Sequence, residues 1–389
     1  MIRSPHCGPS LVRVLLLWMV AWRVSGADAE ATPTKIVAGK EPFDRIWDAF
    51  KLYDNEDNST IQRFALVGRY QGQYWWVDAE QGRADGWENR RIFFGAEAQL
   101  FRQLKIQVQA RFNTETDNLY NGLYQAFVEW FPNDAFRLSA GRVDFSYAGL
   151  ERSTSSVNIP TIERGLLVNQ LMPGEVVGAV AKSELGDFTY RAGVFSGSIE
   201  DEFTDFQGGV GAVAGVGYRL PLFFETGTLH LDYFFNNGNH DNNAFQPYDH
   251  IVSLWHRGQL GPFALGADLT WAHGLDGRPQ VFGITLLPTY EFARDVIFHG
   301  DAWQAVLRYQ FAISDGDNGL QLQKRYEQEV VPGGFGNRYH AVYGGVNYLI
   351  YGDRFKWMAG IEYSVMNDSA GDGGSFAGWT YATAIRVAF

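Results

Sequence analysis

The chain has 389 residues, of which 46% are hydrophobic and 15% aromatic, and its formal net charge is −12. Beyond the N-terminus, no apolar run reaches the roughly 18 residues that a membrane-spanning helix needs. The acidic balance argues against nucleic acid as a partner, because its phosphates require clustered cations. A mean hydropathy of −0.20 still permits a transmembrane β-barrel, in which only every second strand residue meets lipid.

The first 29 residues have the pattern of a secretory signal peptide. Arg3 and Arg13 precede the apolar run VLLLWMVAW, and the small residues SGADA follow it, which predicts cleavage after Ala27 or Ala29. The leader carries three arginines and one aspartate, so its removal changes the formal net charge from −12 to −14. Cys7, the one cysteine of the sequence, lies within the leader. Disulfides and cysteine-based metal or nucleophile chemistry are therefore excluded from the mature chain.

Residues 30–60 are expected to form an N-terminal periplasmic segment with a short amphipathic helix. Phe43, Ile46, Trp47 and Phe50 follow the i, i+3, i+4, i+7 spacing of one helical face. Such a helix either packs on the body of the protein or docks at the mouth of a barrel. The sequence DNEDNST that follows predicts a polar loop.

From residue 61 to residue 389, apolar and polar residues alternate in a long series of segments. The segment LKIQVQARFN, at 104–113, alternates without exception, which predicts a strand with one dry face and one wet face. The segments are expected at 63–76, 91–100, 104–113, 123–131, 136–142, 176–185, 188–196, 209–220, 228–236, 249–260, 263–272, 281–290, 301–313, 340–351, 355–366 and 376–389. The predicted fold class is all-β, a transmembrane antiparallel β-barrel of about 16 strands, an even number that is typical of bacterial outer membranes.

The connections between these segments alternate between short and long. Short links are predicted at 102–103, 132–134, 186–187, 261–262 and 352–353, and long polar links at 79–87, 143–175, 196–208, 237–248, 314–339 and 367–375. A transmembrane barrel has short periplasmic turns and long outer loops, whereas a soluble sandwich does not sort its connections in this way. The alternation therefore favours a membrane barrel. The segment at 288–300, where a short turn is expected, fits this pattern least well.

The final strand, WTYATAIRVAF, ends the chain on an aromatic residue. Tyr381, Ile385, Val387 and Phe389 occupy alternate positions on one predicted face of this strand. The pattern resembles the C-terminal assembly signal of outer-membrane barrels, in which a terminal Phe follows alternate apolar positions. The resemblance implies the barrel assembly machinery as a partner. The dry faces of the strands are then expected to contact outer-membrane lipid.

The segment SAGRVDFSYAGLERSTSSVNIPTIERGL, at 139–166, resembles the phosphate-selective porin O and P family. In that family the corresponding region follows a strand and leads into the constriction loop. The resemblance is carried by Gly141-Arg142, Phe145-Ser146, Leu150-Glu151, Ser155-Ser156 and Glu163-Arg164. Similar strands extend it over residues 61–389. It implies a sixteen-stranded, homotrimeric channel of the bacterial outer membrane, with the third outer loop folded inward and cationic side chains that guide small anions such as phosphate or polyphosphate.

Ten cationic residues are predicted to line the pore and guide anions. The third outer loop and its base contribute three, and the wet faces of the strands contribute seven: Arg142, Arg152 and Arg164, then Arg63, Arg69, Arg91, Lys105, Arg111, Arg137 and Arg191. Arginine suits this task because its forked donors match phosphate oxygens and it stays charged. The competing interpretation is structural pairing of these cations with Glu97, Glu129, Glu151 and Glu163. The seven lysines of the sequence form no cluster of the kind expected of a phosphate-binding constriction.

No catalytic, cofactor or metal site is predicted. The loop SDGDNG, at 314–319, lacks the ligand spacing and the closing Glu of a calcium loop, and the histidines of the mature chain have no metal-ligand spacing. The predicted function is passive diffusion of small anions through an outer-membrane porin. The alternatives are a general or other-substrate porin, for sugars or cations, and, from other classes, an outer-membrane adhesin or a barrel enzyme.

Overall fold

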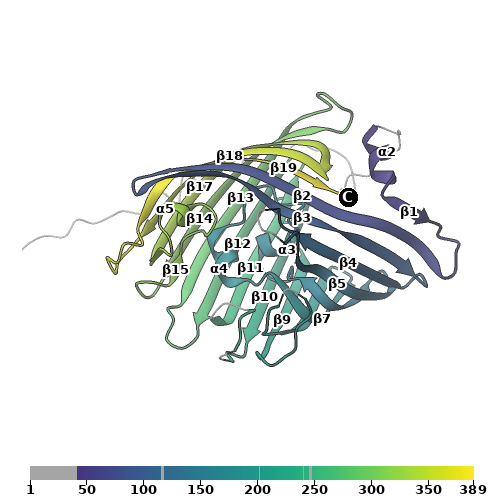
Figure 1. The fold of residues 1–389 in the computed structure, drawn as a ribbon, viewed down its shortest axis with the longest axis horizontal. Helices are drawn as coiled ribbons and strands as arrows, with labels where there is room; N and C mark the ends of the chain where they lie inside the picture. The colour runs from purple at the N-terminus through teal and green to yellow at the C-terminus, as the bar shows by residue number, and fades with distance from the viewer. Residues whose placement is uncertain (1–41, 115–117, 201, 240, 245–247) are drawn as a thin grey trace, which may run out of the picture. The chain divides into compact units, whose positions relative to one another are not determined.

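Sixteen long strands make up most of the chain in the computed structural model, which describes residues 42–389 except 115–117, 201, 240 and 245–247. They form a closed antiparallel sheet in which each strand pairs with the next and the last pairs with the first (Figure 1). The strands are β2 (Ile61–Ala79), β3 (Gly82–Leu100), β4 (Leu104–Phe112), β5 (Tyr120–Asn133), β6 (Phe136–Asp144), β7 (Glu175–Leu185), β8 (Phe188–Ser196), β9 (Val210–Arg219), β10 (Thr226–Asn236), β11 (Tyr248–Leu260), β12 (Phe263–Gly274), β13 (Val281–Arg294), β14 (Ala302–Ser314), β17 (Arg338–Asp353), β18 (Phe355–Asn367) and β19 (Phe376–Ala388). The predicted sixteen-stranded barrel is confirmed.

The remaining described elements are short. They are the helices α2 (Pro42–Asp48), α3 (Leu150–Ser153), α4 (Leu166–Leu171) and α5 (Glu327–Val330), and the strands β1 (Lys51–Asp54), β15 (Leu320–Gln321) and β16 (Phe335–Gly336). None of the helices that the structure describes has both the length and the hydropathy to cross a bilayer. The predicted signal peptide, residues 1–29, lies outside the described residues and stays a prediction.

The barrel closes where β19 pairs with β2. The ladder runs from Gly378 opposite Ala79 to Ala388 opposite Arg69. Phe389 continues it, because its N–H donates to the Gly68 carbonyl at 3.0 Å and its carbonyl accepts the Gly68 N–H at 2.9 Å. Beyond this point, β1 pairs antiparallel with the same edge of β2, from Lys51 opposite Ala65 to Asp54 opposite Arg63. The edge of β2 is therefore paired along both segments.

Helix α2 packs at the short-turn end of the barrel, beside the C-terminus (Figure 1). Trp47 donates from its indole N–H to the Ala388 carbonyl at 2.7 Å, and Tyr351 donates from its hydroxyl to Asp44 at 2.6 Å. The predicted helical face is only partly used, since Ile46 is 50% exposed. The helix ends before Phe50, whose ring stacks instead on Phe389 with centroids 3.8 Å apart.

Short and long connections alternate around most of the barrel as expected, but the pattern fails in two places. The predicted long loop at 79–87 is wrong, because β2 and β3 continue as a hairpin joined by residues 80–81. Its polar residues pair across the two strands instead of forming a loop. Arg83 lies 2.7 Å from Asp78, and Tyr74 donates a hydrogen bond to Asp85 at 2.9 Å.

The turn between β13 and β14, in the segment that fitted the expected pattern least well, is longer than the turns at 261–262 and 354 on the same end of the barrel. Strand β13 extends to Arg294, and residues 295–301 form the turn. The Asp301 carboxylate accepts backbone N–H bonds from Val296, Ile297 and Phe298 at 2.6, 2.8 and 3.0 Å. These bonds satisfy backbone donors that have no strand partner, which explains how a longer turn is tolerated here.

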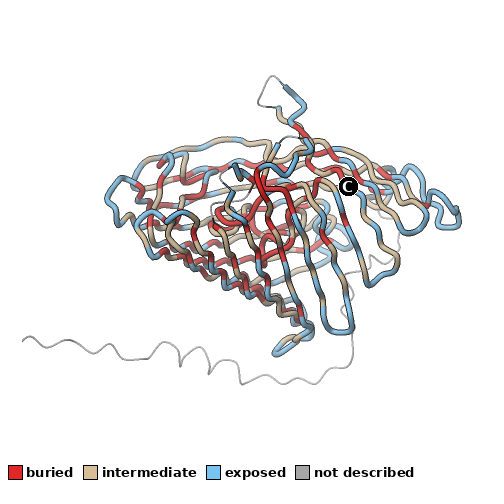
Figure 2. Tube along the Cα trace, turned by 90° about the horizontal axis from the view of Figure 1, so that it is seen from below, coloured by how far each residue is buried: buried red, intermediate tan, exposed pale blue. Residues whose placement is uncertain are grey.

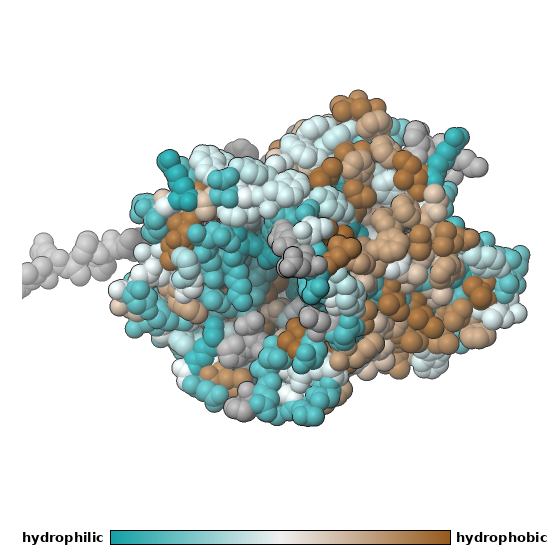
Figure 3. All heavy atoms as spheres, in the orientation of Figure 1, coloured by the Kyte–Doolittle hydropathy of each residue, from teal (hydrophilic) through white to brown (hydrophobic). Residues whose placement is uncertain are grey.

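The two faces of the barrel wall differ in polarity. In the segment LKIQVQARFN, Ile106 and Val108 are 38% and 47% exposed on the outside, whereas Gln107 and Gln109 are 9% and 6% exposed on the inside. Figure 3 shows apolar residues gathered over the wall to the right of centre and hydrophilic residues to their left. The period of two therefore separates an apolar outer surface from a polar lumen.

The third outer loop, between β6 and β7, folds into the lumen, as expected. Arg308 of β14 lies 2.9 Å from Glu151, and the Leu166 N–H donates to the Gln310 side chain at 2.8 Å. On the neighbouring strand β17, the Asn347 amide donates to the Pro160 carbonyl at 2.8 Å, and on β2 the Gln71 amide donates to the Ser156 carbonyl at 3.1 Å. Figure 2 shows buried chain inside the ring of strands. The loop is thus tied to the wall from several directions.

Replacing Phe389 with Ala is expected to lower the free energy of unfolding by about 2 kcal/mol, because the ring stacks on Phe50 and covers Gly68. A Cβ built on Gly68 would lie only 2.3 Å from the Phe389 ring, so the ring occupies the space that a side chain at position 68 would need. The measurement is the urea midpoint of the protein refolded in vesicles, followed by tryptophan fluorescence. Phe206→Ala, in the outer loop between β8 and β9 and 50% exposed, is the control. Equal losses for the two variants would contradict a role in closure.

Candidate functional site

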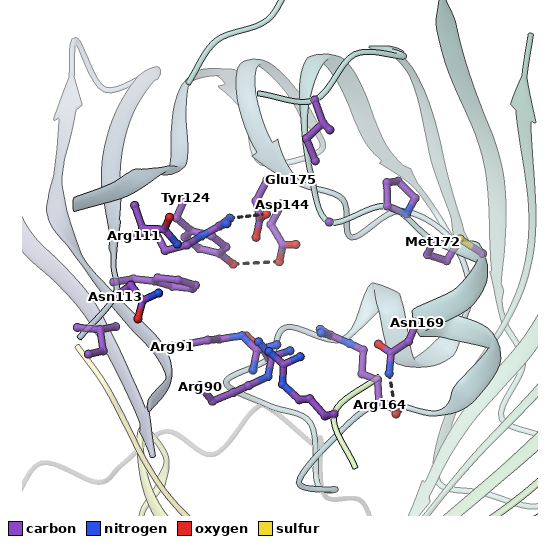
Figure 4. Close-up of a pocket in the computed structure, with 18 of the residues that line it drawn as sticks. Arg90, Arg91, Arg111, Asn113, Tyr124, Asp144, Arg164, Asn169, Met172 and Glu175 are labelled. Atoms are coloured by element: carbon purple, nitrogen blue, oxygen red, sulfur yellow. Dashed lines mark hydrogen bonds and ion pairs between the residues drawn. The ribbon is translucent and has the colours of Figure 1, made fainter. Parts of the chain in front are cut away.

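A cavity of about 560 Å³ lies between strands β3, β4 and β5 of the wall and the third outer loop (Figure 4). Its lining, within the described residues, contains six arginines and three carboxylates: Arg90, Arg91, Arg111, Arg152, Arg164 and Arg325, with Glu88, Asp144 and Glu175. Positive charges therefore exceed negative ones by three. Glu163, which contacts Arg90 and Arg325, reduces that excess by one.

Arg90 and Arg91 both enter the lumen because β3 contains a bulge. Gln71 of β2 lies opposite Arg91, but the next residue, Gly72, lies opposite Asn89, so Arg90 is an extra residue in the ladder. A bulge of this kind re-aims side chains by shifting the alternation. Figure 4 shows both arginines directed into the cavity. In a regular strand, consecutive residues point to opposite faces, so either Arg90 or Arg91 would point out of the barrel.

Besides Arg90 and Arg325, two arginines of the cavity are held by carboxylates. Arg111 of β4 lies 2.6 Å from Glu175, and Arg152 of α3 lies 2.6 Å from Asp144. The Tyr124 hydroxyl also donates a hydrogen bond to Asp144 at 3.1 Å (Figure 4). The charge of each arginine is balanced locally, so these pairs set the shape of the cavity more than its net charge.

Arg91 and Arg164 have neutral hydrogen-bond acceptors. Arg91 donates to the Gln71 side-chain oxygen at 2.6 Å, and Arg164 donates to the backbone carbonyls of Glu151 and Thr154 at 3.0 and 2.8 Å. Burial lowers the pKa of Arg164 to about 10, so the side chain stays protonated at neutral pH. In the described part of the chain, neither arginine forms an ion pair with a carboxylate. They carry the uncompensated charge of the cavity.

The seventh outer loop, residues 315–337, reaches the same cavity. Arg325 lies 2.8 Å from Glu88 of β3 and 3.8 Å from Glu163 of the third loop. Gln323 donates from its side chain to the Arg164 carbonyl at 3.1 Å. The third and seventh loops are therefore in direct contact, and both contribute cations to the cavity.

The structure brings four of the ten predicted pore cations to this cavity: Arg91, Arg111, Arg152 and Arg164. Arg69 is not in the lining but donates to Ser156 and Tyr124, which are. Four others contact groups elsewhere: Arg63 and Lys105 share Glu97, Arg137 pairs with Glu129, and Arg191 pairs with Asp232. Arg142 is 2% exposed and donates to the carbonyls of Leu123, Glu200 and Glu202. It anchors the fourth outer loop to the wall.

Arg90, Arg325 and Arg308 belong to the site or its support but were absent from the sequence-based set. Alternation within the segment at 301–313 would place Arg308 on the wet face, so a signal existed for it. Arg308 is 3% exposed and lies 2.9 Å from Glu151 and 2.8 Å from Glu362, which makes it an anchor of the third loop. Arg90 depends on the bulge, and no periodicity marks Arg325. Among the described residues, no cluster of His, Cys, Asp and Glu has the arrangement of a metal site.

Comparison with known families decides the class of the protein. Residues 64–247 match the family model of the phosphate-selective porins O and P. The chain is an outer-membrane porin. The resemblance found in the sequence is confirmed over that region. No curated protein matches the sequence of this porin significantly.

Solved structures share the fold of this porin at low sequence identity. An anion-selective porin from Comamonas acidovorans has a TM-score of 0.55 and 12% identity, covering 84% of this chain and 99% of that chain. OmpF of Salmonella typhi, in complex with daunomycin, has a TM-score of 0.57 and 11% identity, covering 87% and 100%. OprB of Pseudomonas putida has a TM-score of 0.53 and 11% identity, covering 84% and 94%. These likenesses establish the fold alone.

Glu327 of α5 anchors the seventh loop inside this porin. The residue is 1% exposed, and its carboxylate accepts hydrogen bonds from the Gln323 N–H, the Tyr339 hydroxyl and the Ser364 hydroxyl at 2.8, 2.7 and 2.5 Å. Burial raises the pKa of Glu327 to about 7, although these hydrogen bonds act in the opposite direction. The protonated form is therefore favoured in the docked loop.

Docking of the seventh loop is expected to weaken as the pH rises. The docked state binds the Glu327 proton more tightly than a free carboxyl with a pKa of 4.5 does, so its stabilisation is complete below that value and is lost as the pH rises through about 7. Hydrogen exchange of residues 315–337, corrected for the intrinsic rate at each pH, measures this. Glu327→Gln removes the titration and should flatten the pH dependence. The same pH dependence in that variant would assign it to another group.

Proposed function

We propose that this porin conducts small anions, phosphate among them, by passive diffusion. The observation that carries the proposal is the cationic excess around the cavity between the barrel wall and the third loop, with Arg91 and Arg164 hydrogen-bonded to neutral acceptors. The matching family is named phosphate-selective, and the porin from Comamonas acidovorans is described as anion-selective, which supports the same proposal.

The mechanism is electrostatic. A narrow, partly dehydrated passage strengthens the attraction between fixed cations and an anion in transit. Guanidinium groups present forked N–H donors that match the oxygens of phosphate. Several sites of moderate strength, instead of one deep site, let the anion leave as well as enter. The ion pairs Arg111–Glu175 and Arg152–Asp144 moderate the attraction by balancing part of the charge.

The acidic total charge of the porin does not oppose this proposal. Permeation depends on the charges that line the narrowest passage, while charges on loops and rims are screened by salt over about 10 Å. Outside the cavity, cations such as Lys105 and Arg137 are paired with Glu97 and Glu129. Selectivity is therefore assigned to the cavity and not to the chain as a whole.

Replacing Arg91 with Gln is expected to lower the ratio of anion to cation permeability about twofold to fivefold, the scale of one unit charge a few ångströms away in water. Arg91 is the most informative choice because its hydrogen-bond partner, Gln71, is neutral, so no carboxylate loses an ion-pair partner. The measurement is the reversal potential of the purified porin in a planar bilayer under a potassium chloride gradient.

The matched control for this measurement is Arg219→Gln. Arg219 lies at the end of β9, its side chain is 70% exposed, and it is 3.5 Å from Asp187. Removing the same charge there should leave the reversal potential almost unchanged. Equal shifts for the two variants would show that position within the lumen does not matter. Cation preference in the unaltered porin would refute the proposal and favour a general or other-substrate porin.

We further propose a homotrimer in contact with outer-membrane lipid, reached through the signal peptide and the barrel assembly machinery. The apolar outer wall and the terminal aromatic residue support this route. OmpT of Vibrio cholerae, described in a trimer form, shares the fold with a TM-score of 0.52 and 14% identity. Native mass spectrometry in detergent should show three times the protomer mass. A monomer mass under conditions that keep the barrel folded would contradict the trimer.

A further inference from the structure

Glu163 of the third loop lies in an unusual set of donors. Its Oε1 atom is 2.7 Å from Nε of Arg90, 3.2 Å from the Gln73 amide nitrogen and 3.8 Å from Nε of Arg325. These groups come from the bulge of β3, from the adjacent paired strand β2 and from the seventh loop. The side chain of Glu163 is 11% exposed. One carboxylate oxygen thus occupies the point where the two loops and the wall converge.

The donor set around this oxygen is the set that an oxyanion requires. Arg90 and Gln73 donate N–H hydrogen bonds to the Glu163 oxygen, and the Arg325 guanidinium adds a second positive charge, a combination of the kind found at phosphate and carboxylate sites. Burial opposes ionisation of Glu163, but the charges of Arg90, Arg325 and Arg91 outweigh it and hold its pKa well below the ordinary value. The carboxylate is therefore a permanent anion in an anion-binding position.

The backbone beside Glu163 is held independently of this side chain. Arg308 donates to the Glu163 carbonyl at 2.7 Å, and Arg386 donates to the carbonyl of Ile162. Arg325 keeps Glu88 as a closer partner at 2.8 Å. The third loop consequently does not depend on the Glu163 carboxylate for its position, and the side chain is free to give up its contacts without unfolding the loop.

We propose that Glu163 is a specificity-determining residue, whose carboxylate fills an oxyanion site between Arg90 and Arg325 and is displaced there by a permeating oxyanion. The proposal rests on the anion conduction proposed above. An oxyanion such as phosphate presents several oxygens at once to the N–H donors of Arg90, Gln73 and Arg325, in a geometry that matches forked guanidinium groups, whereas chloride is a single spherical acceptor. The competition weakens oxyanion binding enough for release, as conduction requires.

The test is titration of the chloride current with inorganic phosphate, in planar bilayers, for the porin and for Glu163→Gln. The variant keeps an acceptor for Gln73 and removes one negative charge. It is expected to lower the half-blocking phosphate concentration about fivefold or more, the scale of one unit charge a few ångströms away in water. Glu129→Gln is the control, because it removes a carboxylate from an arginine pair outside the cavity, with Arg137 at 3.2 Å.

A second variant distinguishes competition between the Glu163 carboxylate and phosphate from a purely structural role of Glu163. If Glu163 occupies the site, Arg325→Gln should weaken phosphate block more in the Glu163→Gln background than alone, because Arg325 is then open to the anion. Unchanged or weaker phosphate block in Glu163→Gln would overturn the proposal, as would equal effects of Arg325→Gln in both backgrounds. The reversal potential of the unaltered porin tests anion conduction separately, so failure of one idea is distinguishable from failure of the other.

Discussion

Closure of the sheet is the constraint on which the rest of this structure depends. A strand edge left open in the hydrocarbon region would leave N–H and C=O groups without partners, at a cost of several kcal/mol for each group. The porin meets this requirement at the seam between β2 and β19, where Phe389 pairs with Gly68 and β1 continues along the edge of β2. Once the ring is closed, one strand face points outward and the other encloses a polar lumen.

That polar lumen creates a second constraint, the balance of buried charge. A cation removed from water is costly unless a carboxylate or several hydrogen-bond acceptors compensate it. Arg308, placed between Glu151 and Glu362, shows full compensation, and it serves to fasten the third loop. Arg91 and Arg164 show a different solution, in which neutral oxygens accept the hydrogen bonds and the net charge remains. We therefore propose that arginines with neutral acceptors serve the anion pathway, whereas arginines paired with carboxylates stabilise the fold.

The two inward loops explain how this charge is focused. The third loop brings Arg152 and Arg164 toward the wall, and the seventh loop adds Arg325 from the other side. Each loop is anchored at a distance from the cavity, through Arg308 for the third loop and through Glu327 for the seventh. Anchors away from the passage hold the cations in place while leaving the space between them open.

Much of the architecture could be predicted because its cause is local. Alternation with a period of two marks each strand, and the polarity of the connections separates the two ends of the barrel. The same reasoning failed at residues 79–87, where Arg83 and Asp85 were assigned to a loop. They lie on a paired strand and bind Asp78 and Tyr74 across the hairpin. Local composition cannot distinguish a polar loop from a polar hairpin that extends past the wall.

The sequence by itself determined the strands and their inside and outside faces, because these depend on neighbours along the chain. The inward third loop followed from the family resemblance. Only the tertiary structure decided which cations share the cavity. Arg90 enters the lumen through a bulge that breaks the alternation, and Arg325 arrives on a loop more than two hundred residues away from β3 in the chain. Contacts of this kind are set by barrel closure and loop docking, which leave no periodic signal in the sequence.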